Sequence, residues 1–165
     1  MLRLFLLRHA KAEPAVGGND PARPLTAGGT KQARAVGAKL AAAFGRPDLV
    51  LVSPARRTRE TLAALSEAIT PPPDAISEDD LYSGDADDYR RIVAEHGGSN
   101  RSLLVVGHNP AIHEFAIGMA TPGDAPKLAK FPVGTLAALS FPVEAWRDLQ
   151  PRSGALSALM LTDPD

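Results

Sequence analysis

Three short apolar runs, each ending in a polar turn, constrain most strongly what this chain can fold into. The runs cover residues 2–7, 49–52 and 103–106. Each is typical of a strand that is buried in a sheet. A helical pattern follows each run, and strands that alternate with helices in this way usually form a parallel sheet. The chain is therefore expected to be an α/β protein whose ligand site lies at the carboxyl ends of its strands.

Helical periodicity and capping residues place the expected helices. They cover residues 27–44, about 54–68, 86–96 and about 110–120. Thr26 and Asp85 directly precede the first and the third of these helices and are suited to be their N-caps. Pro54 suits the first position of the second helix, because a residue at that position does not need an N–H group for a hydrogen bond within the helix. These assignments predict helices packed on a sheet.

The remaining segments complete the expected architecture. Residues 12–24 and the proline-rich residues 121–132 are expected to be loops, the second of them at the surface. In residues 135–141 and 155–162, apolar residues either alternate with polar ones or follow one another without interruption. Both patterns predict strands, so these segments are expected to be the last two strands, which could form a hairpin. The order of elements predicts an α/β layered fold. No linker divides the 165 residues, so we expect a single domain over residues 1–165.

Polar side chains of a particular kind follow each apolar run. Arg8 and His9 follow the first, and Gly107 and His108 follow the third. The second run leads into Ser-Pro-Ala-Arg-Arg-Thr-Arg-Glu-Thr, residues 53–61. Because the carboxyl ends of parallel strands meet at one edge of a sheet, these groups are expected to lie close together. Together they predict a phosphate pocket with a histidine nucleophile.

His9 is the expected nucleophile, because a neutral imidazole can attack phosphorus and form a phosphohistidine that water then hydrolyses. Arg8 and Arg57 are expected to bind the phosphoryl oxygens, since guanidinium groups offer fixed pairs of donors. If the second helix begins at Pro54, Arg57 lies in its opening turn, where free N–H groups also favour an anion. Ser53 is expected to shape this turn or to bond phosphate.

His108 is a further candidate for the pocket. If the bound phosphate keeps its ring protonated, His108 would act as an additional cationic donor to that phosphate. A backbone carbonyl that accepts from His9 would fix the tautomer whose attacking nitrogen is free. Asn109 and Lys11 are neighbours of the two histidines in the sequence. Each of them either contributes to substrate binding or merely lies nearby.

Other charged side chains have simpler interpretations. His96 is expected to be a cation in the last turn of its helix. His113 follows His108 by five residues, which places the two on different faces of a helix, so no shared metal site is expected. Arg23 either approaches the pocket or lies at the surface before a helix cap.

Four segments, in order along residues 2 to about 118, resemble the histidine phosphatase superfamily and, within it, the SixA-type phosphohistidine phosphatases. They are Leu-Arg-His-Ala-Lys-Ala-Glu at 7–13, Arg-Pro-Leu-Thr at 23–26, residues 53–61, and Val-Gly-His-Asn-Pro at 106–110. The resemblance implies a three-layer α/β/α sandwich with a mostly parallel central sheet. It also implies a metal-independent phosphatase without a cofactor, with His9 as nucleophile and with Arg8, Arg57 and His108 as the phosphate pocket.

The chain departs from the superfamily pattern at several positions. Ala10 stands where glycine is commoner, and Ala15 replaces the asparagine of mutase-type members, which argues against mutase activity. The glutamate that serves those members as general acid has no single counterpart here. The candidates are Glu78, Asp79, Asp80 and Asp85. A substrate with a P–N bond needs such an acid less, because the leaving imidazole can be protonated before the bond breaks.

Composition narrows the classes of partner. A net charge of −1 with 22 % charged residues lacks the basic stripe of a nucleic-acid binder. The apolar run at the N-terminus is too short to span a membrane, and the absence of cysteine is compatible with a reducing cytoplasm. We therefore expect a cytoplasmic phosphatase that acts on protein phosphohistidine and releases inorganic phosphate. A phosphomonoesterase for a small phosphate ester and a low-turnover phosphate-binding or phosphoprotein-binding module are the alternatives.

Overall fold

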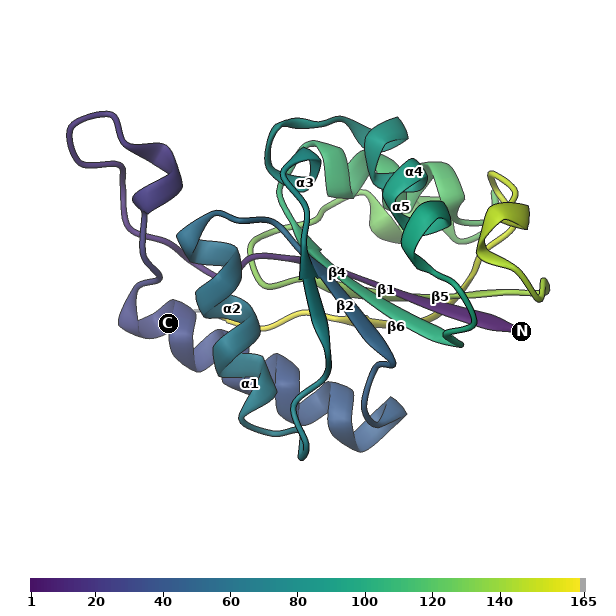
Figure 1. The fold of residues 1–165 in the computed structure, drawn as a ribbon, viewed down its shortest axis with the longest axis horizontal. Coiled ribbons are helices and arrows are strands. Elements are labelled where there is room, and N and C mark those ends of the chain that lie inside the picture. The colour runs from purple at the N-terminus through teal and green to yellow at the C-terminus, as the bar shows by residue number, and fades with distance from the viewer. Residues whose placement is uncertain (164–165) are drawn as a thin grey trace.

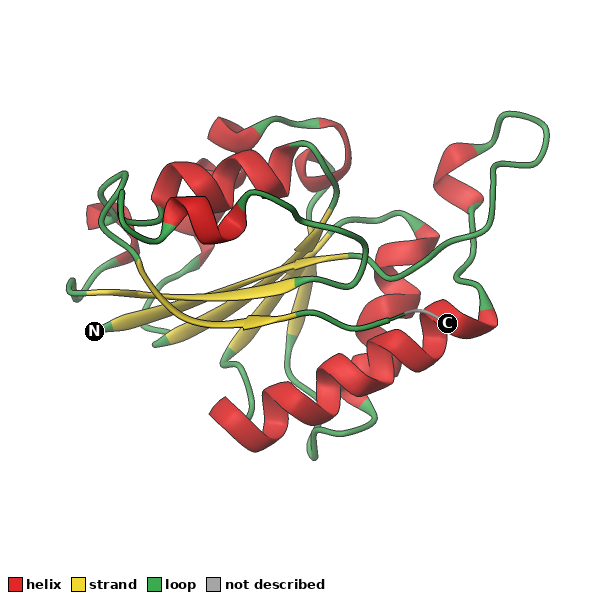
Figure 2. Ribbon diagram, turned by 180° about the vertical axis from the view of Figure 1, so that it is seen from behind, coloured by secondary structure: helices red, strands yellow, loops and turns green. Residues whose placement is uncertain are grey.

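The computed structural model describes residues 1–163, and Figures 1 and 2 show one sheet between two layers of helices. The strands are β1 (Leu2–Arg8), β2 (Leu49–Val52), β3 (Ala75–Ser77), β4 (Ser102–Gly107), β5 (Leu136–Phe141) and β6 (Ala155–Met160). The helices are α1 (Ala27–Phe44), α2 (Arg56–Ser66), α3 (Asp80–Ser83), α4 (Ala86–His96) and α5 (Ala111–Met119). Short 3-10 helices are η1 (Asp20–Ala22), η2 (Ala125–Leu128) and η3 (Trp146–Asp148).

The order and direction of the strands bring three strand ends together. The sheet has the order β3-β2-β4-β1-β5-β6. Its first four strands are parallel, whereas β5 and β6 are antiparallel to their neighbours. Arg8 pairs with Gly107, and Val52 pairs with Val106. The residues that follow β1, β2 and β4 therefore emerge side by side at one edge of the sheet.

Each face of the sheet is buried by its own helices. Successive residues of a strand point to opposite faces, so Leu7 joins one buried cluster and Leu6 joins the other. The first cluster contains Val36 of α1 and Leu65 of α2, and the second contains Phe115 of α5. This layering confirms the expected α/β/α fold class with a mostly parallel sheet.

The expected helix caps are present at two of the helices. The Thr26 side chain accepts a hydrogen bond from the N–H of Gly29 at 2.8 Å and so begins α1. Asp85 accepts from the N–H of Asp88 at 3.0 Å, and the Asp88 carboxylate accepts from the N–H of Asp85 at 2.9 Å. This reciprocal pair satisfies two N–H groups that the helix itself leaves without partners.

The expected start of α2 at Pro54 is wrong, because the helix begins at Arg56. Ala55 is extended, with ψ of 145°, and its N–H donates to the Ser53 hydroxyl at 3.3 Å. Pro54 and Ala55 therefore belong to a turn that the Ser53 side chain holds. Arg57 still lies in the opening turn of the helix.

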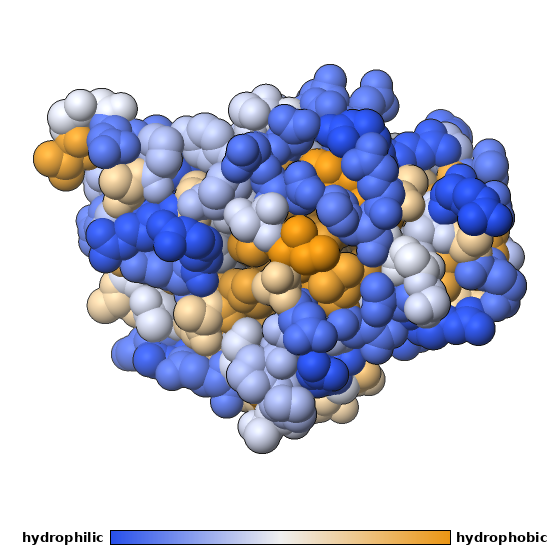
Figure 3. Space-filling model, viewed as in Figure 1, coloured by the Kyte–Doolittle hydropathy of each residue, from blue (hydrophilic) through white to orange (hydrophobic). Residues whose placement is uncertain are grey.

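Two other stretches differ from the sequence expectation. Residues 121–132 were expected to form a surface loop, yet they contain η2, and the side chains of Leu128 and Phe131 are buried against α5 and its surroundings. The stretch after the proline tract contains β3 and α3, which the sequence pattern does not predict. β3 is a short, exposed edge strand, and Figure 3 shows apolar surface near the middle of the face where it runs.

A loop of residues 13–24 stands away from the two helical layers in Figures 1 and 2. Its base is closed by the N–H of Glu13, which donates to the carbonyl of Pro24 at 2.8 Å. Gly17 and Gly18 near its tip have φ of 62° and 74°, and the neighbouring Val16 is 87 % exposed. The loop carries η1 back toward the start of α2. Among residues 1–163, no helix combines the length and hydropathy that crossing a bilayer requires.

Candidate active site

The two histidines that end β1 and β4 lie beside each other at the carboxyl edge of the sheet. The N–H of His9 donates to the carbonyl of Gly107 at 3.1 Å, and the N–H of Ser53 donates to the carbonyl of Val106 at 3.1 Å. The hydrogen bonding of the sheet thus continues past the ends of β1 and β2 and fixes the backbone at His9 and at Ser53. The ring centroids of His9 and His108 are 5.3 Å apart. The structure brings together the groups that the sequence places after the three apolar runs.

The ring of His9 is oriented by its own backbone surroundings. Its Nδ1 lies 2.7 Å from the carbonyl oxygen of Ala10, and a carbonyl only accepts, so Nδ1 bears the proton and donates. Nε2 is then left with a lone pair. His9 is 6 % exposed, and its pKa lies at about 4, below the ordinary 6.5. Burial is the main cause, and the nearby cations Arg57 and Arg8 lower the pKa further. The hydrogen bond to Ala10 raises the pKa but does not offset these effects. The ring is therefore neutral near pH 7, with Nε2 able to act as a nucleophile.

The backbone after His9 is tied to α2. The N–H of Ala10 donates to the Thr61 hydroxyl at 3.0 Å, and that hydroxyl donates to the carbonyl of Arg57 at 2.7 Å. Thr61 is buried. The threonine that ends the 53–61 motif therefore couples the position of His9 to the first turn of α2.

Arg57 directs a buried guanidinium toward His9. Its Nε lies 3.4 Å from Nε2 of His9, and the side chain is only 7 % exposed. Arg8 is half-buried, and its Nη1 donates to the carbonyl of Phe131 at 3.1 Å. Burial, and then the charge of Arg57, lower the pKa of Arg8. Two guanidinium groups thus lie at the nucleophile, where they can bind phosphoryl oxygens.

His108 is held on both its ring and its backbone. Its Nε2 lies 2.8 Å from the Ser53 hydroxyl, and its N–H donates to the Tyr89 hydroxyl at 3.1 Å. Burial lowers the pKa of His108 to about 3, and the charge of Arg57 lowers it further. His108 is therefore neutral in this structure near pH 7. A bound phosphoryl dianion would oppose the effect of Arg57, since an opposite charge favours the protonated form.

Asn109 lies with these groups, as the sequence places it. Its Nδ2 donates to the carbonyl of Phe131 at 3.0 Å, so it shares that oxygen with Arg8. Its Oδ1 is buried without a hydrogen-bond partner among the described residues. A role for Asn109 in substrate binding stays a prediction. The N–H of Lys11 donates to the side-chain oxygen of Gln32 at 3.1 Å, and the carbonyl of Lys11 accepts from the N–H of Thr26 at 3.0 Å.

Two residues of the site escaped sequence reasoning, namely Asp20 and Tyr82. The Asp20 carboxylate accepts from Arg57 at 3.1 Å, from Arg23 at 3.1 Å and from the Tyr82 hydroxyl at 2.6 Å. The Tyr82 hydrogen bond and the two arginines lower the pKa of Asp20 to about 2, so it is ionised. The centroid of the Tyr82 ring lies 5.4 Å from that of His108. Asp20 lies in the loop before the 23–26 segment, outside the four segments of family resemblance, so no sequence signal indicated it.

Three of the four carboxyl groups expected to supply a general acid, those of Glu78, Asp80 and Asp85, contact other groups. Glu78 lies 2.5 Å from Nε2 of His96, and Asp80 accepts from Arg91 at 2.7 Å. Asp85 caps α4, and the Asp79 carbonyl accepts from the N–H of Tyr82 in the turn of α3. None of these contacts reaches His9 or Arg57. His96, expected as a cation at a helix end, is paired with Glu78, and Nε2 of His113 lies 2.6 Å from the carbonyl of Leu128, away from His108.

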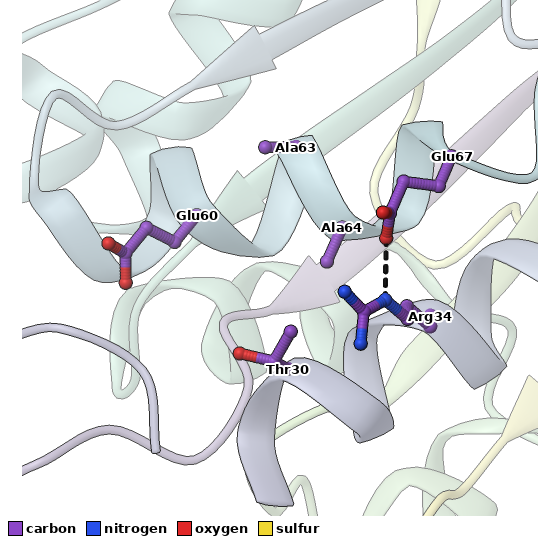
Figure 4. Close-up of a pocket in the computed structure, with 6 residues that line it drawn as sticks. All are labelled: Thr30, Arg34, Glu60, Ala63, Ala64 and Glu67. Atoms are coloured by element: carbon purple, nitrogen blue, oxygen red, sulfur yellow. Dashed lines mark hydrogen bonds and ion pairs between the residues drawn. The ribbon is translucent and has the colours of Figure 1, made fainter. Parts of the chain in front are cut away.

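A cavity of about 370 Å³ lies next to His108, between α3, α4 and the start of α5. Its lining includes Tyr82, Asp85, Asp88, His108, Asn109 and Glu114. A second hollow, of about 340 Å³, lies between α1 and α2 (Figure 4). It contains the ion pair of Arg34 and Glu67, at 2.6 Å, and no histidine. Of these two cavities, only the first is lined by a histidine of the candidate site, His108.

The chain is similar to one family and to proteins that share nearly its whole length. The model of the histidine phosphatase superfamily (branch 1) matches residues 4–82. An uncharacterized protein of Mycobacterium tuberculosis is 33 % identical over 156 residues, which are 91 % of this chain and 96 % of that protein. The structure of a "putative phosphohistidine phosphatase SixA" from Nakamurella multipartitia is 33 % identical, with a TM-score of 0.87 over 97 % of this chain and 95 % of that one. A "putative phosphohistidine phosphatase SixA" from Agrobacterium tumefaciens is 28 % identical, with a TM-score of 0.83 over 98 % of both chains.

Proposed function

The chain belongs to the histidine phosphatase superfamily, and from that premise we propose that it removes the phosphoryl group from protein phosphohistidine through a covalent intermediate on His9. One observation carries the proposal. Nδ1 of His9 donates to the carbonyl of Ala10, so Nε2 carries the lone pair, which accepts a long hydrogen bond from Nε of Arg57 at 3.4 Å. A phosphoryl group that reaches Nε2 would therefore meet a nucleophile and a fixed cation together.

In the first step, the lone pair of His9 Nε2 forms a bond to phosphorus while the P–N bond of the substrate breaks. The bonding pair goes to the imidazole of the substrate, which takes up a proton from water. Arg57 and Arg8 would stabilise the negative charge on the phosphoryl oxygens in the transition state. Stabilisation of this kind by fixed donors is usually the largest single contribution to the rate enhancement. His108, protonated once phosphate is bound, would add a third donor.

In the second step, the oxygen of a water molecule attacks the phosphorus of phospho-His9. The P–Nε2 bond breaks with its electron pair returning to Nε2, and inorganic phosphate leaves with the oxygen and both protons of that water. Nδ1 of His9 keeps its proton and donates it to the carbonyl of Ala10 in both steps, so His9 returns to its starting tautomer. Splitting one hard displacement into two easier ones is the general advantage of covalent catalysis.

The proposed substrate class is supported by the contacts of three of the four acids that the sequence singles out. An alkoxide leaving group needs a positioned acid, whereas an imidazole can be protonated from solvent before it leaves. Glu78, Asp80 and Asp85 are bound to other groups, and Asp20 is ionised, with a pKa of about 2. This supports a P–N substrate over an ester. The similarity to the phosphohistidine phosphatases described from Nakamurella multipartitia and Agrobacterium tumefaciens supports the same substrate.

The test is release of inorganic phosphate from a phosphohistidine-bearing protein and from an aryl phosphate, with a metal chelator present. We expect faster release from the phosphohistidine protein, no effect of the chelator, and loss of release in His9→Ala. His113→Ala is the matched control, because His113 contacts Leu128 outside the site, and it should keep full activity. A preference for the aryl ester would instead indicate a small-molecule phosphomonoesterase. Binding of phosphate without release from either substrate would indicate a binding module.

A further inference from the structure

We propose that Asp20 is a positioning residue for Arg57, which holds the far end of the guanidinium so that the Nε edge faces His9. The inference rests on the proposed function, because it concerns the cation that would meet the phosphoryl group on His9. Neither the family resemblance nor the motif spacing points to a role for this aspartate.

Asp20 contacts Arg57 at two points. Nη1 of Arg57 donates to the backbone carbonyl of Asp20 at 3.0 Å, and Nη2 donates to its Oδ2 at 3.1 Å. The guanidinium is planar and its donors have a fixed geometry, so two bonds at the outer nitrogens determine where the third nitrogen points. That third nitrogen, Nε, lies 3.4 Å from Nε2 of His9.

Asp20 is itself held from two sides. The Tyr82 hydroxyl donates to Oδ2 at 2.6 Å, and Nη1 of Arg23 donates to Oδ1 at 3.1 Å. Nε of Arg23 also donates to the carbonyl of Glu13 at 2.7 Å, at the base of the projecting loop. These bonds fix a loop residue that few apolar contacts would hold. The three-residue η1 therefore gains its order from the same groups that face the pocket.

Asp20 does not contact the Nε–H of Arg57, which is the N–H that faces His9. Nε lies toward His9, whereas Asp20 binds Nη1 and Nη2 at the other end of the guanidinium. The N–H of Nε, now in a long contact with His9, and the second N–H of Nη2 remain for phosphoryl oxygens. The phosphoryl group therefore does not need to displace Asp20, which is what distinguishes a positioning residue from a carboxylate that blocks the pocket.

The test is a double-mutant cycle of Asp20→Ala and Arg57→Ala, measured as kcat/KM. We expect Asp20→Ala to lower kcat/KM by about 10²-fold, as misplacement of a catalytic group by about 1 Å does. Because the effect runs through Arg57, Asp20→Ala should cause no further loss in the Arg57→Ala background. Asp20→Asn keeps an acceptor oxygen and should recover most of the loss. Glu67→Ala, which removes a carboxylate from an arginine on the outer surface (Figure 4), should stay within about twofold of wild type.

Other results would overturn the proposal. Equal losses from Asp20→Ala with and without Arg57 would mean that Asp20 acts on the substrate directly. A gain of activity or of phosphate affinity in Asp20→Ala would mean that Asp20 blocks the pocket. An unchanged kcat/KM in Asp20→Ala would mean that Arg57 needs no such support.

Two readouts separate this proposal from the proposed function. The cycle can be measured with the aryl phosphate if phosphohistidine proves not to be the substrate. If neither substrate is turned over, the ¹⁵N–¹H signal of Arg57 Nε decides, read without ligand and with inorganic phosphate added. A distinct signal that shifts with phosphate in wild type, and that is lost or unresponsive in Asp20→Ala, supports the positioning role. The same signal and response in both proteins contradicts it.

Discussion

The two edges of the sheet use the same kinds of charged groups in opposite ways. At the amino edge, Arg101 and the N-terminal amine pair with Glu144, and the side chains of Arg101 and Glu144 are 64 % and 75 % exposed. At the carboxyl edge, His9, Arg57 and His108 are each less than 10 % exposed. Burial removes the screening by water, so charges at the carboxyl edge shift one another's pKa and fix one another's geometry. Burial, more than the number of charges, distinguishes the candidate site from an ordinary surface.

The comparison is tested most strongly by removing one arginine from each edge. We expect Arg57→Ala to lower kcat/KM by about 10²- to 10³-fold, because it deletes a fixed donor to the phosphoryl oxygens. Arg101→Ala should leave kcat/KM unchanged, since its partner Glu144 lies at the far edge. Steady-state kinetics with the phosphohistidine protein measures both. Equal effects of the two substitutions would remove the distinction between the edges.

The pH dependence of stability tests the burial of the two histidines. Their pKa values in the folded chain, about 4 for His9 and about 3 for His108, lie below the ordinary 6.5. The unfolded chain therefore binds more protons between these values, and the free energy of unfolding falls as the pH drops below 6.5. The loss is about 2 kcal/mol per histidine by pH 5. Urea unfolding at pH 7 and pH 5 measures it.

A variant without one titrating ring serves as the check on this prediction. His108→Asn should be less stable than wild type at pH 7 but should lose about half as much stability between pH 7 and pH 5. His113→Ala should keep the wild-type difference, because His113 lies outside the pocket. An identical loss in wild type and His108→Asn would mean that His108 is not buried as a neutral ring.

The smallest effect is expected at the amino edge. Glu144→Ala removes both ion pairs there, yet the midpoint of urea unfolding should not change measurably, because exposed pairs are screened by water and salt. A clear shift of the midpoint, abolished by high salt, would show that the exposed edge also depends on its charges.

The sheet and its buried strands could be predicted from sequence because apolar runs report burial directly. The strand β3 could not, since Ala75, Ile76 and Ser77 are exposed and form no apolar run. The helix α2 begins at Arg56, two residues after the predicted start at Pro54, because the Ser53 side chain holds the intervening residues in a turn. A proline preference alone does not reveal that contact.

The site could be predicted where its residues follow strands, and not where they come from loops. His9 and His108 directly follow strand ends, and Arg57 lies in the first turn of the helix that follows β2, so the sheet determines where these residues lie. Asp20 reaches Arg57 only because the 13–24 loop folds back, and Tyr82 reaches Asp20 through α3. Neither the apolar pattern nor the helical periodicity contains the information that brings these two side chains together.

The projecting loop also offers a spectroscopic handle. The chain contains no cysteine, so Val16→Cys would create a unique thiol at the exposed loop tip. A fluorophore attached there would stay outside the pocket, while η1, four residues further along, is bonded to Arg57. Its anisotropy would report how firmly the bonds of Asp20 hold the loop and should fall in Asp20→Ala, in a protein whose intrinsic fluorophores Tyr89 and Trp146 are buried.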